Sequence, residues 1–281
     1  MIHILLPAYN EALALPALFD AIRRVQWPNG EAYTVVVVDD GSTDATATVC
    51  RSRWEDMPLE VICHGRNLGL GAAMMTGLRH CLSRCGEGDA VIAMDADNTH
   101  SPSLMPEMLR ALRAGSDVVI ASRYVEGGQE IGLAPHRKIL SRCASLMLRV
   151  AFPIPGARDY TCGYRAYSSG ILDRGFRAYS DKLIEEKGFV CMAELLIKLG
   201  VIGAKISEVP LILRYDRKTG ASKMKVARTI GRYFKLITIN RPRVPSGAPL
   251  SALRMNSRQH AAKSTCVDSE RRRPEVEEES V

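Results

Sequence analysis

The sequence predicts an α/β protein with a mostly parallel sheet and flanking helices, and three observations support this. Over the first 123 residues, strand-like apolar runs alternate with amphipathic helical segments. Such alternation is typical of parallel strands joined by right-handed crossovers. Residues 90–94 are apolar throughout, as expected of a strand covered on both faces. With 281 residues, 46% of them hydrophobic, the chain is long enough to bury the core of such a fold.

The first two predicted strands each lead into a helix through a polar loop. Residues 2–6 form a short buried-strand pattern ended by Pro7, and an amphipathic helix follows over residues 13–25. Residues 34–38 are β-branched and predict the second strand, followed by a helix over residues 44–54. Two successive units of this kind favour a mononucleotide-binding half of the fold.

Asp39 and Asp40 stand at the end of the second predicted strand. Carboxylates at this position can hydrogen-bond the ribose or base of a nucleotide. The alternative is ordinary turn chemistry, because Asp-Gly-Ser is also a common loop sequence.

A glycine-rich loop over residues 65–71 follows the third predicted strand, residues 59–64, and leads into a helix that ends near Leu82. The glycines allow close approach of the backbone, and Arg66 can meet a phosphate. The loop is weak evidence by itself, because it matches neither the P-loop nor the dinucleotide-binding fingerprint.

Asp95 and Asp97 directly follow the apolar run, and we expect these two carboxylates to be the centre of the active site. In open α/β sheets, ligands collect just past the carboxyl ends of the strands. Two carboxylates two residues apart can share one hard cation, Mg²⁺ or Mn²⁺, which completes its shell with substrate phosphates. The pair therefore predicts a phosphorylated, nucleotide-linked substrate. The alternative is a solvated Asp-x-Asp turn.

After Arg123 the regular alternation stops. Arg137 and Ser141 are spaced i, i+4 near the start of a predicted helix, where donors and the helix dipole can receive an anion. The alternative is a plain solvated face. The remaining expected elements are helices over 103–114, 136–152 and 194–199, strands over 117–123 and 205–213, a hairpin or strand over 159–167, a flexible loop over 126–132 and a basic loop over 217–223.

Basic residues are concentrated towards the C-terminus. Between Arg214 and Lys235 there are eight Lys or Arg residues and one acid, a net charge of +7 that equals that of the whole chain. Residues 223–240 combine an apolar and a basic stripe, so they predict an amphipathic helix that lies on an anionic membrane or packs on the domain. We expect an α/β domain over 1–222, this helix, and a disordered tail over 241–281.

The eight cysteines are scattered in a chain too long to need disulfide bridges, so we expect reduced, cytosolic thiols. His80, Cys81 and Cys85 lack a second Cys/His pair that would complete a zinc site, and no structural zinc is expected. The N-terminus does not resemble a signal peptide, and no run of 18 apolar residues occurs. We therefore expect no membrane span.

Four motifs occur together in one order and spacing: Pro7-Ala-Tyr-Asn-Glu11, Val38-Asp-Asp-Gly-Ser-Thr-Asp44, Arg66-Asn-Leu-Gly-Leu-Gly71 and the Asp95/Asp97 pair. Over about residues 1–240 this combination resembles the family 2 glycosyltransferases, which have the Rossmann-like GT-A fold. It is most similar to their dolichyl-phosphate mannosyltransferase type. The resemblance implies an inverting reaction in which Asp95 and Asp97 hold the metal and diphosphate. It also implies a nucleoside site made of Pro7, Tyr9, Glu11, Asp39 and Asp40.

Further matches point to the subgroup that acts on polyprenyl phosphates. Ser122-Arg123, Arg137 and Ser141 match the positions that grip the lipid phosphate in that type, and Arg217 to Lys223 matches its basic loop. Two departures stand beside them. Thr99, the third expected metal ligand, stands where the family usually has Gln, and the transmembrane helices of many relatives are absent. The basic helix or an anchoring partner protein must then bring the enzyme to its lipid.

The expected activity is transfer of a hexose, foremost mannose from GDP-mannose, to a polyprenyl or dolichyl phosphate at the cytosolic membrane face, with Mg²⁺ or Mn²⁺ and without a nucleic-acid partner. The alternatives are transfer from a UDP-sugar to a hydroxyl acceptor, and a non-catalytic nucleotide-binding module. A hydroxyl acceptor needs a general base, whereas a phosphate acceptor is already an anion and needs cations. Asp159 is the only obvious spare carboxylate. The candidate cations are Arg123, Arg137, Arg217 and Lys223.

Overall fold

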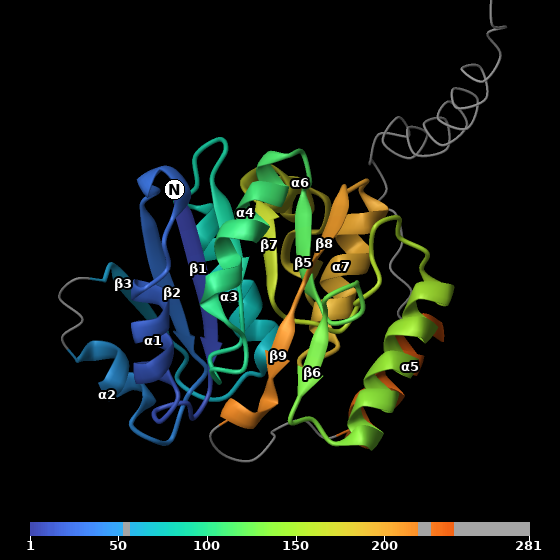
Figure 1. Cartoon of the computed structure of the whole chain (residues 1–281), viewed down its shortest axis with the longest axis horizontal. Coiled ribbons are helices and arrows are strands. Elements are labelled where there is room, and N and C mark those ends of the chain that lie inside the picture. Colours follow the sequence, from blue (N-terminus) through green and yellow to red (C-terminus); the bar gives the residue numbers. More distant parts are fainter. Residues whose placement is uncertain (53–56, 219–225, 239–281) are drawn as a thin grey trace, which may run out of the picture.

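The computed structural model describes residues 1–52, 57–218 and 226–238 (Figure 1). The strands of its main sheet are β1 (Ile2–Ala8), β2 (Tyr33–Asp39), β3 (Leu59–Cys63), β4 (Ala90–Ala93), β5 (Val118–Ser122), β7 (Arg165–Ser168) and β8 (Ile206–Pro210). Within these described ranges they form a seven-stranded sheet in the order β3-β2-β1-β4-β7-β5-β8, in which β7 is antiparallel to both neighbours. The expected mostly parallel sheet is confirmed.

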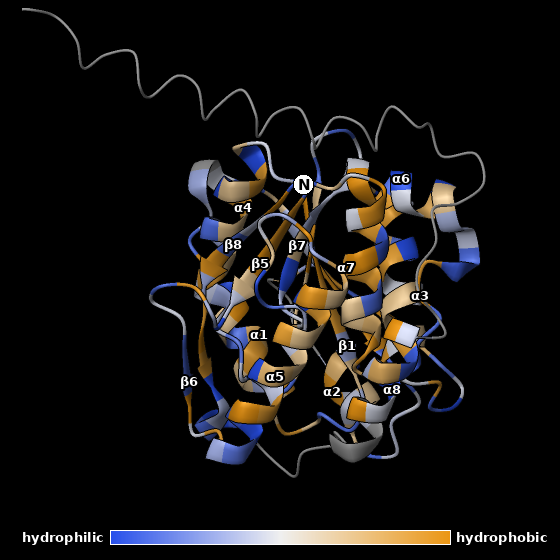
Figure 2. Cartoon of the chain, turned by 90° about the vertical axis from the view of Figure 1, so that its right-hand side faces the viewer, coloured by the Kyte–Doolittle hydropathy of each residue, from blue (hydrophilic) through white to orange (hydrophobic). Residues whose placement is uncertain are grey.

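Helices cover both faces of this sheet. They are α1 (Leu15–Arg23), α2 (Thr46–Arg51), α3 (Leu70–Leu82), α4 (Met105–Arg113), α5 (Pro135–Ala151), α6 (Ser169–Tyr179), α7 (Cys191–Val201) and α8 (Val226–Thr238). Figures 1 and 2 show α1 and α4 on one face and α3, α6 and α7 on the other, with α5 at the β8 side of the molecule. Short 3₁₀ turns cover Pro28–Gly30, Pro102–Leu104, Ser180–Lys182 and Tyr215–Arg217.

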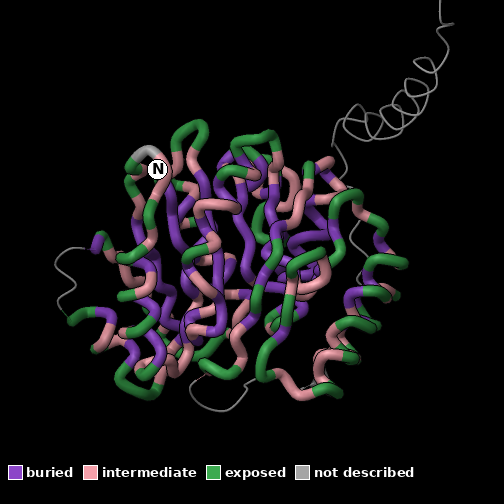
Figure 3. Tube along the Cα trace, in the orientation of Figure 1, coloured by how far each residue is buried: buried purple, intermediate pink, exposed green. Residues whose placement is uncertain are grey.

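The core lies on both sides of the central strands. Val35 to Val38 are fully buried, as are Val118 to Ala121, and Figure 3 shows the strands as a buried layer between the helices. Because helices cover both faces, these strands need apolar side chains at every position, which explains their continuous apolar runs.

The register brings the carboxyl ends of the parallel strands to one edge. Ala8 pairs with Asp39, Asp39 pairs with Cys63, and Leu5 pairs with Ala93. The loops that follow β1, β2, β3 and β4 therefore share the lower edge of the sheet in Figure 1.

Three elements differ from the sequence predictions. The expected flexible loop contains strand β6 (Gln129–Ile131), which pairs in parallel with β9 (Ile212–Arg214). The single strand expected over 205–213 is split at Leu211, whose N–H still donates to Ser122 of β5 (2.8 Å) while its carbonyl accepts from the N–H of Gln129 (2.9 Å), so the chain passes there from the main sheet to the β6–β9 pair. Helix α6 was not predicted; the hydroxyl of Ser168 caps its start by accepting from the N–H of Ile171 (3.2 Å).

Helix α8 packs onto the domain. Its Tyr233 and Leu236 are buried members of the core cluster, whereas Phe234 and Lys235 are exposed. In the part of the chain that the structure describes, no helix is both long enough and apolar enough to cross a bilayer. The expected tail over 241–281 lies outside the described residues.

Candidate active site

A cleft of about 570 Å³ opens at the carboxyl edge of the sheet. Its walls come from the loops after β1, β2, β4 and β5, from the start of α5 and from α8. The sequence-predicted residues that line it are Pro7, Tyr9, Glu11, Asp40, Asp95, Asp97, Thr99, Arg123, Arg137 and Ser141. Among the described residues, Asp39, Arg66 and Arg217 do not line the cleft, and Lys223 lies outside them.

Side chains cross-link the loops after β1 and β2. The N–H of Asn10 donates to the hydroxyl of Ser42 (2.9 Å), and the N–H of Thr43 donates to Oδ1 of Asn10 (2.8 Å). The N–H of Glu11 donates to the hydroxyl of Thr46 (2.8 Å). These bonds fix the backbone of both loops, so the expected nucleoside wall is held in place before a ligand binds.

Asp40 shapes the glycine-rich loop. The N–H groups of Leu68 and Gly69 donate to its carboxylate at 2.9 and 2.8 Å, and Nδ1 of His64 lies 2.7 Å from it. The backbone at Gly41 has a positive φ of 69°, and a Cβ there would lie 2.3 Å from the carbonyl carbon of Arg66. The two loops are therefore pressed together, and only glycine fits at the contact.

Asp39 and Arg66 flank this contact without entering the cleft. Asp39 is buried, and its Oδ1 accepts from the N–H of Ser42 (3.0 Å). Arg66 is exposed at the surface of the glycine-rich loop.

The acidic pair after β4 has a cation of its own. Nζ of Lys218 forms a short ion pair with Oδ2 of Asp97. On the other oxygen, Oδ1 of Asp97 accepts from the hydroxyl (2.6 Å) and the N–H (3.2 Å) of Thr99. Asp95 is partly buried beside this group. Thr99, which was expected to bind the metal together with Asp95 and Asp97, therefore contacts Asp97.

The pKa values of the two carboxyl groups are shifted in opposite directions. Burial raises the pKa of Asp95, and the neighbouring Asp97 carboxylate adds to the shift. Burial also opposes ionisation of Asp97, but the Lys218 ammonium and the Thr99 hydroxyl lower its pKa overall. Asp97 thus remains an anion that holds a cation close to Asp95.

The donor set of the acidic pair fits Mg²⁺ or Mn²⁺. Asp95 and Asp97 offer carboxylate oxygens in the cleft, the ligand type that these hard cations prefer. The Lys218 ammonium already stands as a positive charge on Asp97, which marks the position as one where the protein accommodates a cation.

Arg123 is held by a buried carboxylate. Its Nε and Nη2 donate to the two oxygens of Asp159 at 2.7 and 2.8 Å, and Nη2 also donates to the hydroxyl of Thr161 (2.7 Å). Nη1 donates to the hydroxyl of Ser141 (3.1 Å). Asp159 is fully buried. Burial alone would raise its pKa, but the Arg123 guanidinium and hydrogen bonds lower it. The spare carboxylate is thus a structural partner of Arg123.

Tyr215 links the two ends of the cleft. Nη1 of Arg137 donates to its hydroxyl (2.7 Å), and the guanidinium lies 5.1 Å from the ring centroid. Nζ of Lys218 lies 5.6 Å from the same ring. One aromatic side chain therefore positions a cation at the acidic pair and another at the start of α5.

Sequence reasoning missed Lys218 and Tyr215. The basic loop was recognised from its composition, but Arg217 is exposed whereas its neighbour Lys218 reaches Asp97. In the sequence, the cluster of basic residues was the signal that this loop binds an anionic group. Which of two adjacent basic residues points inward depends on the 3₁₀ turn Tyr215–Arg217, which the sequence pattern does not reveal.

Comparison with known proteins identifies the family. Residues 3–184 match the family description "Glycosyl transferase family 2". The chain is a family 2 glycosyl transferase. The family expected from the four motifs is thereby confirmed.

Three curated relatives of this glycosyl transferase carry related names. The undecaprenyl-phosphate mannosyltransferase of Micrococcus luteus is 35% identical over 78% of this chain and 86% of its own length. The dolichol-phosphate mannosyltransferase of Pyrococcus furiosus is 32% identical over 84% of this chain and 62% of its own length. The polyprenol monophosphomannose synthase of Mycolicibacterium smegmatis is 31% identical, over 83% and 84% respectively.

Solved structures confirm the GT-A fold of the glycosyl transferase. Glucosyl-3-phosphoglycerate synthase from Mycobacterium tuberculosis, solved with Mn²⁺, UDP and glucosyl-3-phosphoglycerate, has a TM-score of 0.58 at 19% identity, covering 84% of this chain and 77% of its own. TarS 1-349 of S. aureus in complex with UDP-GlcNAc has a TM-score of 0.56 at 18% identity, covering 84% and 65%.

Proposed function

We propose that this glycosyl transferase moves a hexose from a nucleotide sugar to a polyprenyl phosphate. Relatives named as polyprenyl-phosphate mannosyltransferases, 31–35% identical over most of the chain, support the acceptor class and favour mannose as the sugar. GDP-mannose is the donor we infer for that sugar, and a UDP-sugar is the rival that the test below includes.

The observation that carries the proposal is the composition of the wall beside α5, here called the acceptor wall. Among the described residues, this wall presents two guanidinium groups, two hydroxyls and apolar side chains, without a carboxylate. Its members are Arg123, Leu133, Arg137, Leu140, Ser141, Ala144 and Thr161. Cations suit a phosphate monoester, and apolar side chains suit the first carbons of a lipid. A hydroxyl acceptor would need a base, whereas the two carboxylates behind this wall, Asp159 and Glu130, both contact Arg123 and do not line the cleft.

The residues of the cleft divide the work of the reaction. Arg137, near the N-terminus of α5, and Ser141, one turn later, would hold the acceptor phosphate, assisted by the helix dipole. Asp95 and Asp97 would hold Mg²⁺ or Mn²⁺, which supplies charge neutralisation at the diphosphate leaving group. Lys218 would leave Asp97 and meet the same diphosphate, because its ammonium and the metal compete for one carboxylate. Positioning and charge would then supply most of the catalysis.

An exposed apolar and basic surface on α5 supports a peripheral location at the membrane. Ile139, Leu146 and Val150 share one face of the helix and are 62%, 60% and 75% exposed. Arg142 and Arg149 are exposed beside them. Apolar and cationic side chains on one helical face suit an anionic bilayer, which on this proposal is the cytosolic leaflet. The acceptor wall continues from the same helix, so a lipid phosphate would enter the cleft beside the bilayer.

The decisive test is a panel of radiolabelled GDP-mannose, UDP-glucose and UDP-GlcNAc, each assayed with and without polyprenyl phosphate and with MgCl₂ or MnCl₂. Label from GDP-mannose in the organic phase, only when polyprenyl phosphate and metal are present, is the expected result. Transfer to water-soluble hydroxyl acceptors without lipid phosphate would replace the proposal by its rival. Binding of nucleotide without transfer to any acceptor would leave the non-catalytic module.

A further inference from the structure

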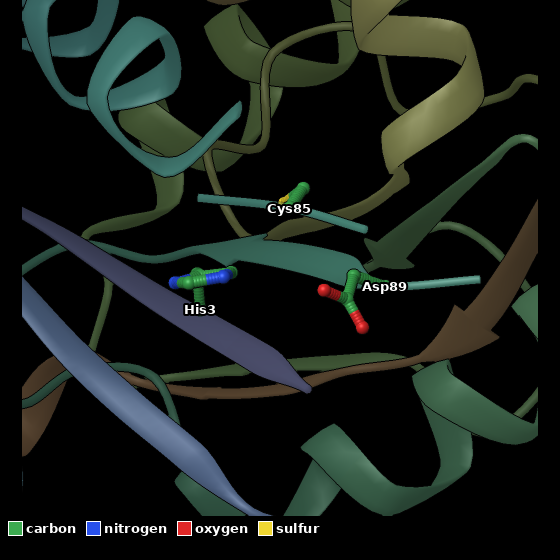
Figure 4. Close-up of side chains that lie close together, drawn as sticks. All are labelled: His3, Cys85 and Asp89. Carbon is green, nitrogen blue, oxygen red and sulfur yellow. The ribbon is translucent and has the colours of Figure 1, made fainter. Parts of the chain in front are cut away.

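A second cluster of metal-ligating side chains lies at the opposite edge of the sheet from the cleft. It contains His3 of β1, Cys85 in the turn after α3 and Asp89 just before β4 (Figure 4). A ring nitrogen, the thiol sulfur and a carboxylate oxygen of these residues lie within 4.8 Å of one another. The strand register explains why they are close, because Ile2 of β1 pairs with Ala90 of β4, and His3 and Asp89 are the residues next to this pair.

His3 is a buried side chain whose ring nitrogens lack a protein partner. It is only 1% exposed, and neither nitrogen has a hydrogen-bond partner among the described residues. Buried polar groups nearly always have partners, so such an imidazole needs an explanation. Burial lowers the pKa of His3, which keeps the ring neutral and a nitrogen lone pair available.

Asp89 is oriented by its neighbours. Its Oδ2 accepts from the N–H of Gly86 (2.7 Å), and its Oδ1 lies 2.6 Å from the Met1 amino group. A carboxylate has about four lone-pair sites, so each oxygen can accept a further bond.

Cys85 is a half-buried free thiol in the glycine-containing turn after α3. Gly86 and Gly88 follow it, and Gly88 has a positive φ of 81°. Cys85 and Asp89 also line a cavity of about 580 Å³, which gives an ion a route to the cluster and leaves room for a water ligand.

We propose that His3, Cys85 and Asp89 form a site for a zinc-class divalent cation, completed by a water molecule from this cavity. A nitrogen, a sulfur and an oxygen donor favour Zn²⁺ or Co²⁺ over Mg²⁺ and Mn²⁺, which prefer the all-oxygen pair in the cleft. Ligands about 2.0–2.3 Å from a tetrahedral ion are about 3.5 Å apart, so the three atoms must draw in by about 1 Å. The turn after α3 can supply this movement.

Binding converts the thiol into a thiolate. Burial raises the pKa of Cys85 to about 11, so the S–H proton is present before the metal arrives. The sulfur–metal bond forms as that proton leaves to solvent, one proton for each ion bound. The bound ion would join β1, the end of α3 and the start of β4, and so would stabilise the edge of the sheet opposite the cleft.

The test uses the full chain carrying Asp95→Asn and Asp97→Asn, so that the cleft does not compete for metal. Titration with CoCl₂ should give a thiolate-to-cobalt charge-transfer band that saturates at one ion per chain, and ZnCl₂ should displace it. Cys85→Ser should abolish the band. His3→Gln should weaken zinc binding at least about a hundredfold in calorimetry. The matched control, Cys143→Ser, removes an exposed thiol on α5 and should change neither reading.

Two results would overturn the site. One is a chain with no charge-transfer band at millimolar Co²⁺; the other is a band that survives Cys85→Ser. Circular dichroism of each variant guards against misfolding. If His3→Gln does not fold, Asp89→Asn takes its place, and undiminished zinc affinity in that variant would also contradict the proposal.

Discussion

Lys218 is a cation that the protein supplies to its own acidic pair. The ammonium and a divalent ion compete for Asp97, so Lys218→Met should tighten Mn²⁺ binding in the absence of nucleotide. A charge-assisted bond is typically worth about 1.5–3 kcal/mol, which corresponds to roughly ten- to a hundredfold in affinity. Electron paramagnetic resonance of free Mn²⁺ measures this directly. Lys187→Met is the matched control, because Lys187 lines the cleft but, in the described part of the chain, forms no ion pair with Asp97. Equal Mn²⁺ affinity in the two variants would remove Lys218 from this role.

Arg137 is the cation we place on the acceptor phosphate. Arg137→Ala should lower kcat/KM for polyprenyl phosphate by roughly ten- to a hundredfold, because one charge-assisted bond is lost. Binding of the sugar nucleotide should stay nearly unchanged. Assays with a short-chain acceptor in detergent avoid any effect on membrane binding, and Arg149→Ala, exposed on the same helix, serves as the control. Wild-type turnover by Arg137→Ala would contradict the proposed acceptor site.

Asp159 stabilises the fold through Arg123. Removing one partner of a buried ion pair typically costs about 3–5 kcal/mol, so Asp159→Asn should lower the free energy of unfolding by roughly that amount at pH 7. Because the folded-state pKa of Asp159 is lowered, this stabilisation is complete above about pH 4, near the unfolded value, and is lost as the pH falls through the folded pKa.

Urea unfolding at pH 7 and pH 3 tests this, with Asp173→Asn, in an exposed ion pair with Arg177, as the control. An equal gap between wild type and Asp159→Asn at both pH values would refute the ion-pair explanation. Loss of transfer in Asp159→Asn does not identify a general base, since the substitution also frees Arg123.

At the scale of single residues, the sequence could predict those site residues whose positions depend on one helix or one strand. Asp95 and Asp97 could be found because they end a strand, and Arg137 and Ser141 because they share a helical face. The Lys218–Asp97 and Arg123–Asp159 contacts join segments 121 and 36 residues apart. Such pairs depend on how the chain folds back, and no local pattern encodes that.

Among the elements, α5 and α8 differ in how much of their apolar surface the domain covers. The sequence predicted that α8 either lies on an anionic membrane or packs on the domain. Its Tyr233 and Leu236 are buried, and Nε of Arg232, which lines the cleft, lies 3.1 Å from Oε2 of Glu186, as expected of the packed alternative. Helix α5 instead exposes the apolar face defined by Ile139, Leu146 and Val150. Apolar periodicity predicted both helices, but it does not indicate which apolar face packs against the rest of the protein.

The face of α5 should govern binding to vesicles. Replacing Leu146 and Val150 by Ser should weaken binding to anionic liposomes by roughly a hundredfold or more, because each side chain loses apolar burial worth about 1.5–3 kcal/mol when fully inserted. Leu13→Ser, at an 82% exposed leucine before α1, is the matched control. Identical partitioning of all three proteins would return the surface of α5 to an ordinary solvated face.

At the scale of the whole molecule, strand positions were predicted better than strand order. Runs such as Val35 to Val38 are apolar because both faces of the sheet are covered, and this pattern is visible in the sequence. The sequence does not show that antiparallel β7 inserts between β4 and β5, because this position depends on pairing between distant segments. The cleft consequently draws residues from both halves of the chain.

The sheet order also decides when each strand can find a partner during synthesis. Strands β1 to β4 pair with one another, and β4 also pairs with β7, whereas β5 has β7 and β8 as its neighbours, and both of these leave the ribosome later. A nascent chain ending near Arg123 therefore carries one apolar strand with two open edges, a state prone to association. In refolding, pulse-labelled amides of Val35 to Val38 should gain protection before those of Val119 to Ala121. Simultaneous protection would mean that the sheet closes as one cooperative unit.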